Sequence, residues 1–145
     1  MATILLTGGT GFIGSHTAVE LLNLGYDVVI ADNLANSDAS VIDRIETITG
    51  RRPSFSKIDV ADKAALTALF TADKIDAVIH FAGYKAVGES VSMPVAYYRN
   101  NLDSTLTLLE VMKEHGCGRI IFSSSATVYG SNSEAPFAED APTGH

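Results

Sequence analysis

The run Thr7-Gly8-Gly9-Thr10-Gly11-Phe12-Ile13-Gly14 constrains this sequence most strongly. It follows a short apolar run that predicts a buried strand, and it precedes a segment that predicts a helix. In this order, Gly8 permits a sharp turn, Gly11 lets backbone N–H groups approach a pyrophosphate, and Gly14 lets the helix pack closely on the strand. Unpaired N–H groups at the start of the helix favour an anion. Taken alone, the run fits a nucleotide site and a simple capped turn about equally well.

Predicted strands and helices alternate along the rest of the sequence. We predict strands at residues 4–6, 27–32, 53–58, 77–81 and 119–123, and helices at 12–24, 41–48, 63–70 (N-capped by Asp62) and 94–115. Residues 83–93 and 131–145 predict loops. The alternation predicts an α/β fold, a Rossmann-type parallel sheet of order 3-2-1-4-5 with helices on both faces. Its crevice is expected at the carboxyl ends of strands 1 and 4, where the order reverses.

Composition excludes several classes of protein. The length of 145 residues and a hydrophobic content of 46% suit one globular domain. A net charge of −7 without a basic cluster argues against nucleic-acid binding. The lone Cys117 excludes an internal disulfide, and no metal-ligand spacing is present. Because neither a leader nor a membrane-spanning run is visible, we expect a cytoplasmic protein that does not enter membranes.

Two predicted strands end in carboxylates. Asp32 lies eighteen residues after Gly14, where a dinucleotide-binding fold places the acid that accepts from both hydroxyls of the adenosine ribose. Since this carboxylate would repel a 2′-phosphate, we expect NAD rather than NADP; the alternative is a strand-end Asp that caps a turn. Asp59 and Val60 could contact adenine, or Asp59 could cap the next helix.

Small and polar residues follow the other two strands at the expected crevice. Phe81-Ala82-Gly83 leaves room for the middle of the cofactor. Asn100 could hydrogen-bond to the loop after the fourth strand or simply face solvent. Ser123-Ser124-Ser125 places hydroxyls where a substrate would lie, or is only a polar strand exit. His80, within an apolar strand, is interpreted as a hydrogen-bonded core residue.

These motifs together resemble those of the extended short-chain dehydrogenase/reductase family, over all 145 residues. The resemblance rests on residues 7–14, 32–34, 80–83 and 123–130. Its most specific part is Lys85-Ala86-Val87-Gly88-Glu89-Ser90-Val91, which is similar to the members that invert C4 of a UDP-hexose.

The resemblance implies that UDP-glucose and UDP-galactose interconvert through a hydride that NAD takes from C4 and returns to the other face. It implies a UDP-sugar as the substrate and contacts of Lys85 and Ser125 with it, Ser125 acting as a catalytic residue that hydrogen-bonds the reacting hydroxyl. The residues that it implies for NAD are Gly8, Gly11, Phe12, Ile13, Asp32, Asn33, Leu34, Asn36, Ser37, Asp59, Val60, Phe81, Ala82, Gly83, Lys85 and Asn100.

The sequence departs from the family in lacking a Tyr-x-x-x-Lys pair, the family's catalytic base and its lysine. The residues four positions after Tyr26, Tyr84, Tyr97, Tyr98 and Tyr129 are Ile30, Gly88, Asn101, Leu102 and Ser133. We therefore interpret residues 1–145 as an NAD-binding domain that is incomplete at its carboxyl end, with the substrate domain absent. Alone it is expected to be inactive and to expose its fifth strand as an apolar edge. Tyr129 is expected to be structural.

Several alternatives remain open at this stage. Epimerases of UDP-N-acetylhexosamines or UDP-uronic acids share the pattern, and a non-catalytic NAD-binding module would lack the Tyr/Lys pair. Ala126-Thr127 stands where the related 4,6-dehydratases have Asp-Glu, which counts against dehydration. An α/β domain without a cofactor is the least supported. The family also implies a homodimer: Leu102, Leu106, Leu109 and Met112 form one helical face, which suits a partner helix or core packing.

Overall fold

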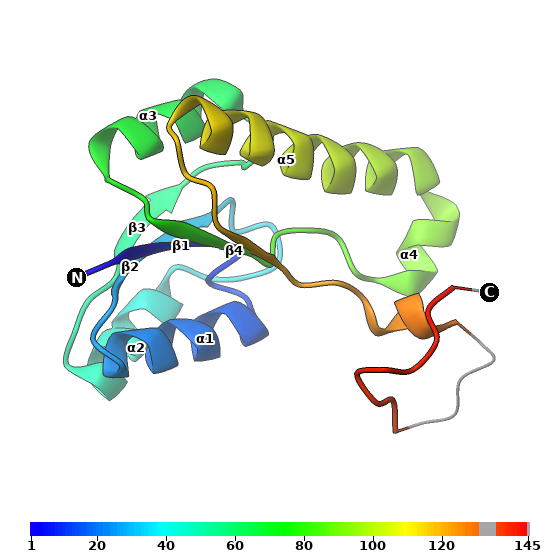
Figure 1. Ribbon diagram of the computed structural model, residues 1–145, viewed down its shortest axis with the longest axis horizontal. Helices are drawn as coiled ribbons and strands as arrows, with labels where there is room; N and C mark the ends of the chain where they lie inside the picture. Colours follow the sequence, from blue (N-terminus) through cyan, green and yellow to red (C-terminus); the bar gives the residue numbers. More distant parts are fainter. Residues whose placement is uncertain (131–135, 145) are drawn as a thin grey trace.

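Five parallel strands form one sheet, in the order β3-β2-β1-β4-β5, in the computed structural model (Figure 1). The structure describes residues 1–130 and 136–144. Its elements are β1 (Thr3–Thr7), α1 (Phe12–Asn23), β2 (Asp27–Asp32), α2 (Ser40–Thr49), β3 (Ser54–Lys57), α3 (Lys63–Ala72), β4 (Ala77–His80), α4 (Val87–Ser92), α5 (Pro94–Glu114), β5 (Ile120–Phe122) and the 3₁₀ turn η1 (Ala126–Tyr129). The predicted fold class and strand order are confirmed.

Helices cover both faces of the sheet, α1 and α2 on one side and α3 and α5 on the other (Figure 1). Successive side chains of a strand point to opposite faces, so Leu5 packs in the core under α3 and α5 while Leu6 packs under α1 and α2. Both leucines are fully buried. Burial on two sides explains why β1, β2 and β4 are continuous apolar runs rather than alternating ones.

Local chemistry sets the helix ends where the sequence predicts them. The Asp62 carboxylate accepts a hydrogen bond from the backbone N–H of Ala65 at 3.1 Å and caps α3. Gly50 ends α2 in the left-handed region with φ 67°. Pro94 begins α5, where its missing N–H costs no helical hydrogen bond.

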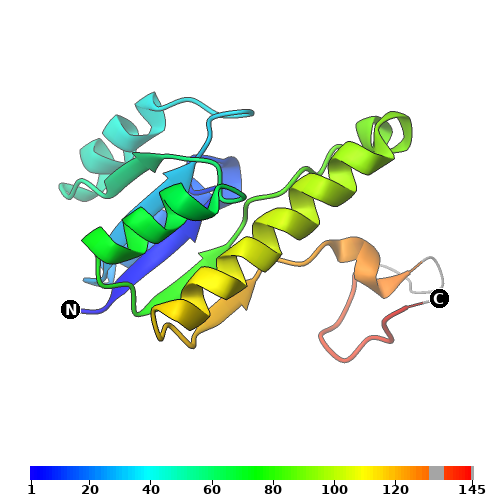
Figure 2. The ribbon, with the colours of Figure 1, turned by 90° about the horizontal axis from the view of Figure 1, so that it is seen from above.

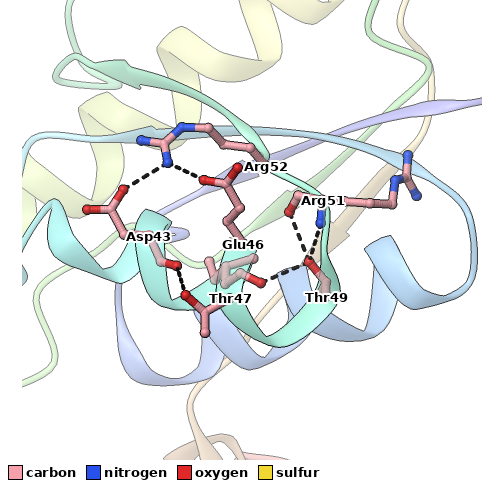
Figure 3. A network of polar contacts seen from close by, with 7 residues as sticks. Asp43, Glu46, Thr47, Thr49, Arg51 and Arg52 are labelled. Atoms are coloured by element: carbon pink, nitrogen blue, oxygen red, sulfur yellow. Dashed lines mark hydrogen bonds and ion pairs between the residues drawn. The ribbon is translucent and has the colours of Figure 1, made fainter.

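Two arginines tie the connection between α2 and β3 to its surroundings, at the amino-terminal edge of the sheet. Arg52 bridges Asp43 and Glu46 of α2 (Figure 3). Arg51 donates to the carbonyl oxygen of Leu22 at 2.8 Å and to the Asp27 carboxylate at 2.9 Å. The ion pairs are solvent-exposed, so they contribute little to stability.

The predicted loop over residues 83–93 is wrong in part, because α4 occupies six of its residues. None of these residues is buried, and although Val87 and Val91 are apolar and one turn apart, six residues are too few to show a helical period in the sequence. Polar contacts hold it instead. Ser90 and Ser92 bond to carbonyl oxygens one turn earlier, and the Glu89 carboxylate accepts from the Tyr97 hydroxyl at 2.6 Å.

The strand β5 is an exposed edge, as expected. Ile121 is 63% exposed and Phe122 is 56% exposed, and the chain leaves the sheet after them towards η1 (Figure 2). The Tyr129 ring stacks on Phe137 with 4.9 Å between centroids, in agreement with a structural role. Residues 131–135 and 145 of the predicted terminal loop lie outside the described residues.

The leucine face of α5 is mostly uncovered. Leu102, Leu106 and Leu109 are exposed, and only Met112 is buried in the core. Core packing is therefore wrong as the interpretation of the three leucines. No helix in the described part of the chain is both long and apolar enough to cross a membrane.

Candidate functional site

A cavity of about 290 Å³, here called the crevice cavity, lies at the carboxyl ends of β1, β2, β3 and β4. Its lining contains every residue predicted for the cofactor except Leu34. The lining residues that the sequence did not indicate for the cofactor are Gly14, Ala31, Ala35, Ile58, Tyr84 and Ser104. All six are of residue types that recur along the chain, so no sequence signal distinguished them. The binding roles of the predicted residues stay predictions.

The glycine turn packs too tightly for side chains. Gly8 has φ 70°, and a Cβ there would lie 2.8 Å from the backbone nitrogen of Ala82. A Cβ on Gly14 would lie 2.5 Å from the carbonyl oxygen of Gly8, so α1 packs against the turn just beyond β1 rather than on the strand itself. Gly11 is the N-cap of α1, and its own N–H donates to Gly8 at 3.2 Å. The free donors are therefore the next three N–H groups, those of residues 12–14.

No side chain caps α1. The N–H groups of its first turn have no acceptor within the helix, because helical bonds begin with Ser15 donating to Gly11 at 2.9 Å. They carry the positive end of the helix dipole to the wall of the crevice cavity. This end of α1 is suited to an anionic group.

Asp32 is buried at the end of β2 and organises the loop after it. One carboxylate oxygen accepts from the backbone N–H of Leu34 at 2.9 Å and the Ser37 hydroxyl at 3.3 Å, and the other accepts from Thr10 N–H at 3.1 Å. Leu34 lies outside the cavity lining, with φ 61°. Since each carboxylate oxygen has two lone pairs, the oxygen facing Thr10 keeps one for a ligand hydroxyl.

Asp59 does not cap α3, so that alternative for Asp59 is wrong. Its carboxylate accepts from the backbone N–H of Ala61 at 2.9 Å, and the amide of Asn33 lies 3.4 Å away. The cap of α3 is Asp62. Asp59 and Val60 both face the crevice cavity, where a contact with adenine remains their predicted role.

The residue that bonds to the loop after β4 is Asn101 rather than Asn100. The Asn101 side chain accepts from Tyr84 N–H at 2.7 Å and donates to Tyr84 C=O at 3.1 Å. Asn100 donates to the side chain of Asn101 at 3.0 Å and lines the crevice cavity. The sequence left a loop bond and a solvent-facing side chain open for Asn100, and only the rotation of α5 shows that its neighbour makes the loop bonds.

A second cavity of about 270 Å³, here called the serine cavity, adjoins the first. Ala82, Gly83, Tyr84 and Lys85 line both cavities, which places Lys85 at their junction. Ser123 and Ser125 line the serine cavity, whereas Ser124 does not. The Ser125 hydroxyl oxygen accepts from the Thr127 hydroxyl at 2.9 Å and from its N–H at 3.3 Å. Its own proton remains available for a ligand.

His80 is a satisfied core residue, as predicted, and lies beneath the serine cavity. Its ring nitrogens contact the hydroxyls of Thr7 at 2.6 Å and Thr105 at 3.0 Å. Burial, with a smaller effect of the Lys85 charge, lowers the pKa of His80 to about 4. The imidazole is therefore neutral at physiological pH.

The crevice cavity carries opposite charges at its two ends. Asp32 and Asp59 place carboxylates at the β2 and β3 end of the crevice cavity, and Lys85 places an ammonium group at its β4 end. Between them lies the free N-terminus of α1. This arrangement fits an elongated ligand that has hydroxyls at one end, an anionic middle and a reacting group at the serine cavity.

Comparisons with known proteins agree with this geometry. The sequence profile of the NAD dependent epimerase/dehydratase family matches residues 4–145. The chain is 53% identical over 141 residues to the UDP-glucose 4-epimerase of Bacillus subtilis, covering 97% of this chain and 42% of that protein. The structure of the Bifidobacterium longum UDP-glucose 4-epimerase in complex with NAD+ and UDP superposes with a TM-score of 0.94 at 55% identity, over 99% of this chain and 43% of that one.

A third relative is named for two sugars. The UDP-Glc/GlcNAc 4-epimerase of Campylobacter jejuni has a TM-score of 0.89 at 34% identity, covering 99% of this chain and 43% of that one. The chain thus spans about two fifths of the length of the relatives that it matches.

Proposed function

Because this chain belongs to the NAD dependent epimerase/dehydratase family, we propose that it forms the NAD-binding part of a UDP-glucose/UDP-galactose 4-epimerase. The observation that carries the proposal is the crevice cavity, in which a tight glycine turn, a free helix N-terminus and a buried strand-end carboxylate converge. Each fits one part of a dinucleotide. When bound, NAD supplies a hydride acceptor and donor for C4 of the sugar.

In this proposal different residues of the chain contact different parts of the cofactor. The N–H groups of residues 12–14 hold the pyrophosphate, and the remaining lone pair of Asp32 accepts from one ribose hydroxyl. Asp59 and Val60 contact adenine, while Lys85 and Asn100 line the path towards the serine cavity. The negative charge of Asp32 disfavours a 2′-phosphate, so NAD binds more tightly than NADP. A titration with both cofactors tests this step, and tighter binding of NADP would contradict it.

At the other end, Ser125 would hold the sugar. Its free proton can hydrogen-bond the 4-hydroxyl oxygen, and Lys85 lies at the junction where the sugar and the cofactor would meet. A general acid–base group at such a position contributes roughly 10²–10⁴-fold to the rate. None of the tyrosines has a lysine four residues later. We propose that the family's Tyr-x-x-x-Lys pair lies outside the 145 residues given.

The experiment compares the full-length protein with a protein limited to residues 1–145. Both are incubated with UDP-galactose, and UDP-glucose is measured by chromatography. We expect turnover by the full-length protein and none by residues 1–145. Turnover by the short form would contradict the need for the Tyr/Lys pair, and no turnover by an NAD-loaded full-length protein would contradict the proposed function.

Specificity is tested on the full-length protein with UDP-galactose, UDP-N-acetylgalactosamine and UDP-galacturonate in parallel. The proposed function predicts the highest kcat/KM for UDP-galactose. A higher kcat/KM for either of the other two sugars would contradict the proposed function and favour an epimerase of that sugar.

We also propose that the full-length protein is a homodimer. The exposed Leu102, Leu106 and Leu109 of α5 support this, since uncovered apolar side chains in a row suit a partner helix. Analytical ultracentrifugation of the wild type and of Leu106→Glu tests it. We expect a dimer and a monomer, respectively; a monomeric wild type would contradict the proposal.

A further inference from the structure

The buried hydrogen bonds around His80 form a chain in which each group donates to the next. Thr105 Oγ1 donates to the Asn101 carbonyl oxygen at 2.8 Å, which uses its only proton. The same oxygen lies 3.0 Å from His80 Nε2. We assign the Thr105 proton to that bond, so Thr105 Oγ1 accepts from His80 and Nε2 carries the hydrogen.

The other ring nitrogen follows from charge neutrality. A neutral imidazole holds one N–H, so Nδ1 is unprotonated and accepts from the Thr7 hydroxyl, 2.6 Å away. The Thr7 oxygen then has a lone pair free for the N–H of Ala82, which lies 3.4 Å from it. The chain therefore runs from Ala82 through Thr7, His80 and Thr105 to Asn101.

Both ends of this hydrogen-bond chain reach the segment Ala82–Lys85. Ala82 is its first donor, and Asn101, its last acceptor, clamps the N–H and C=O of Tyr84 with its side chain. The segment lines both cavities and carries Lys85 at their junction. Thr7 and His80 are fully buried, so water cannot replace their hydrogen bonds.

We propose that His80 is a positioning residue whose neutral Nε2–H tautomer locks this hydrogen-bond chain and thereby holds Lys85 between the cofactor and the sugar. The inference rests on the proposed function for what Lys85 serves. Both ring nitrogens of His80 are occupied by Thr7 and Thr105, so His80 acts through these two hydroxyls. Burial, with a smaller effect of the Lys85 charge, lowers the pKa of His80 and so keeps the ring neutral with a single N–H.

The test is made on the full-length protein with two matched substitutions on α5. Thr105→Val removes the relay hydroxyl, whereas Thr107→Val makes the same chemical change at a half-buried residue of the same helix that takes no part in the chain. His80→Gln keeps a donor near Nε2, and His80→Asn keeps an acceptor near Nδ1 but loses the reach to Thr105. In ¹⁵N NMR of the histidine ring nitrogens, the signals that are missing from the His80→Gln spectrum belong to His80.

In the wild type at neutral pH, NMR is expected to show His80 protonated at Nε2 alone. Thr105→Val should shift that signal and lower kcat/KM about tenfold, the effect of leaving one buried donor unpaired. Thr107→Val should change neither, and His80→Gln should retain more activity than His80→Asn. A ring protonated at Nδ1, or equal effects of the two threonine substitutions, would overturn the proposal. A wild type with the expected tautomer but without epimerase activity would instead refute only the proposed function.

Discussion

Gly14→Ala is the substitution that most directly probes the glycine turn. The new Cβ would lie 2.5 Å from the Gly8 carbonyl oxygen and 2.8 Å from the Gly9 Cα. The first distance is 0.9 Å short of the 3.4 Å at which ordinary van der Waals contact begins. Both neighbours are backbone atoms of a turn, so neither can rotate away. The start of α1 must therefore move outwards from the crevice cavity.

We expect this movement to cost more than alanine gains in a helix. Overpacking of this kind costs roughly 1–3 kcal/mol, against about 0.5–1 kcal/mol gained from replacing a helical glycine. The net loss of unfolding free energy should be about 1–2 kcal/mol. Because the N–H groups of the first turn shift with the helix, NAD affinity should fall about tenfold.

The assays are urea denaturation followed by circular dichroism and calorimetric titration with NAD. Gly88→Ala is the matched control, since Gly88 is also helical and a Cβ there meets nothing within 4 Å. The control should be neutral or slightly stabilising and should bind NAD normally. Equal stability and equal affinity of Gly14→Ala and the wild type would refute the close packing of α1 on the turn.

Three further predictions follow from the buried histidine and from two polar contacts. Because folding lowers the pKa of His80 from 6.5 to about 4, the unfolded chain binds a proton first as the pH falls. Urea denaturation should therefore show an unfolding free energy that is constant above pH 6.5 and falls by up to about 3 kcal/mol towards pH 4, a dependence that His80→Gln removes. The hydrogen bond to Glu89 raises the pKa of Tyr97, so Glu89→Gln should lower that pKa in an ultraviolet titration in which Tyr97→Phe identifies the signal. Lys63 bridges Glu110 and Glu114 on the surface, and Lys63→Met should lower the stability in urea denaturation only slightly, a loss that high salt abolishes.

The sheet order could be predicted because burial on both faces leaves continuous apolar strands separated by helical segments. The carboxyl ends of those strands then identify the crevice, and Asp32 and Asp59 both line it. The helix that the sequence did not predict is held by polar contacts. Helix α4 has no buried residue, so hydrophobic periodicity could not reveal it.

Long-range hydrogen bonds were also beyond sequence reasoning. Thr7 and His80 are separated by 73 positions along the chain and His80 and Thr105 by 25, and only the fold brings their side chains together. The choice between Asn100 and Asn101 depends on the rotation of α5 about its axis, which a helical pattern sets only to within a residue. The exposure of the leucines on α5 could not be predicted either, because it depends on which other elements cover that helix.

The central claim is that the crevice cavity holds an NAD whose hydride leaves C4 of the sugar and returns to it. The most direct measurement uses the full-length protein and UDP-galactose that carries deuterium at C4. Mass spectrometry and NMR of the UDP-glucose formed then show whether the label remains. We predict that the deuterium is retained at C4, because the hydride stays in the closed site. Loss of the label to solvent would contradict the account.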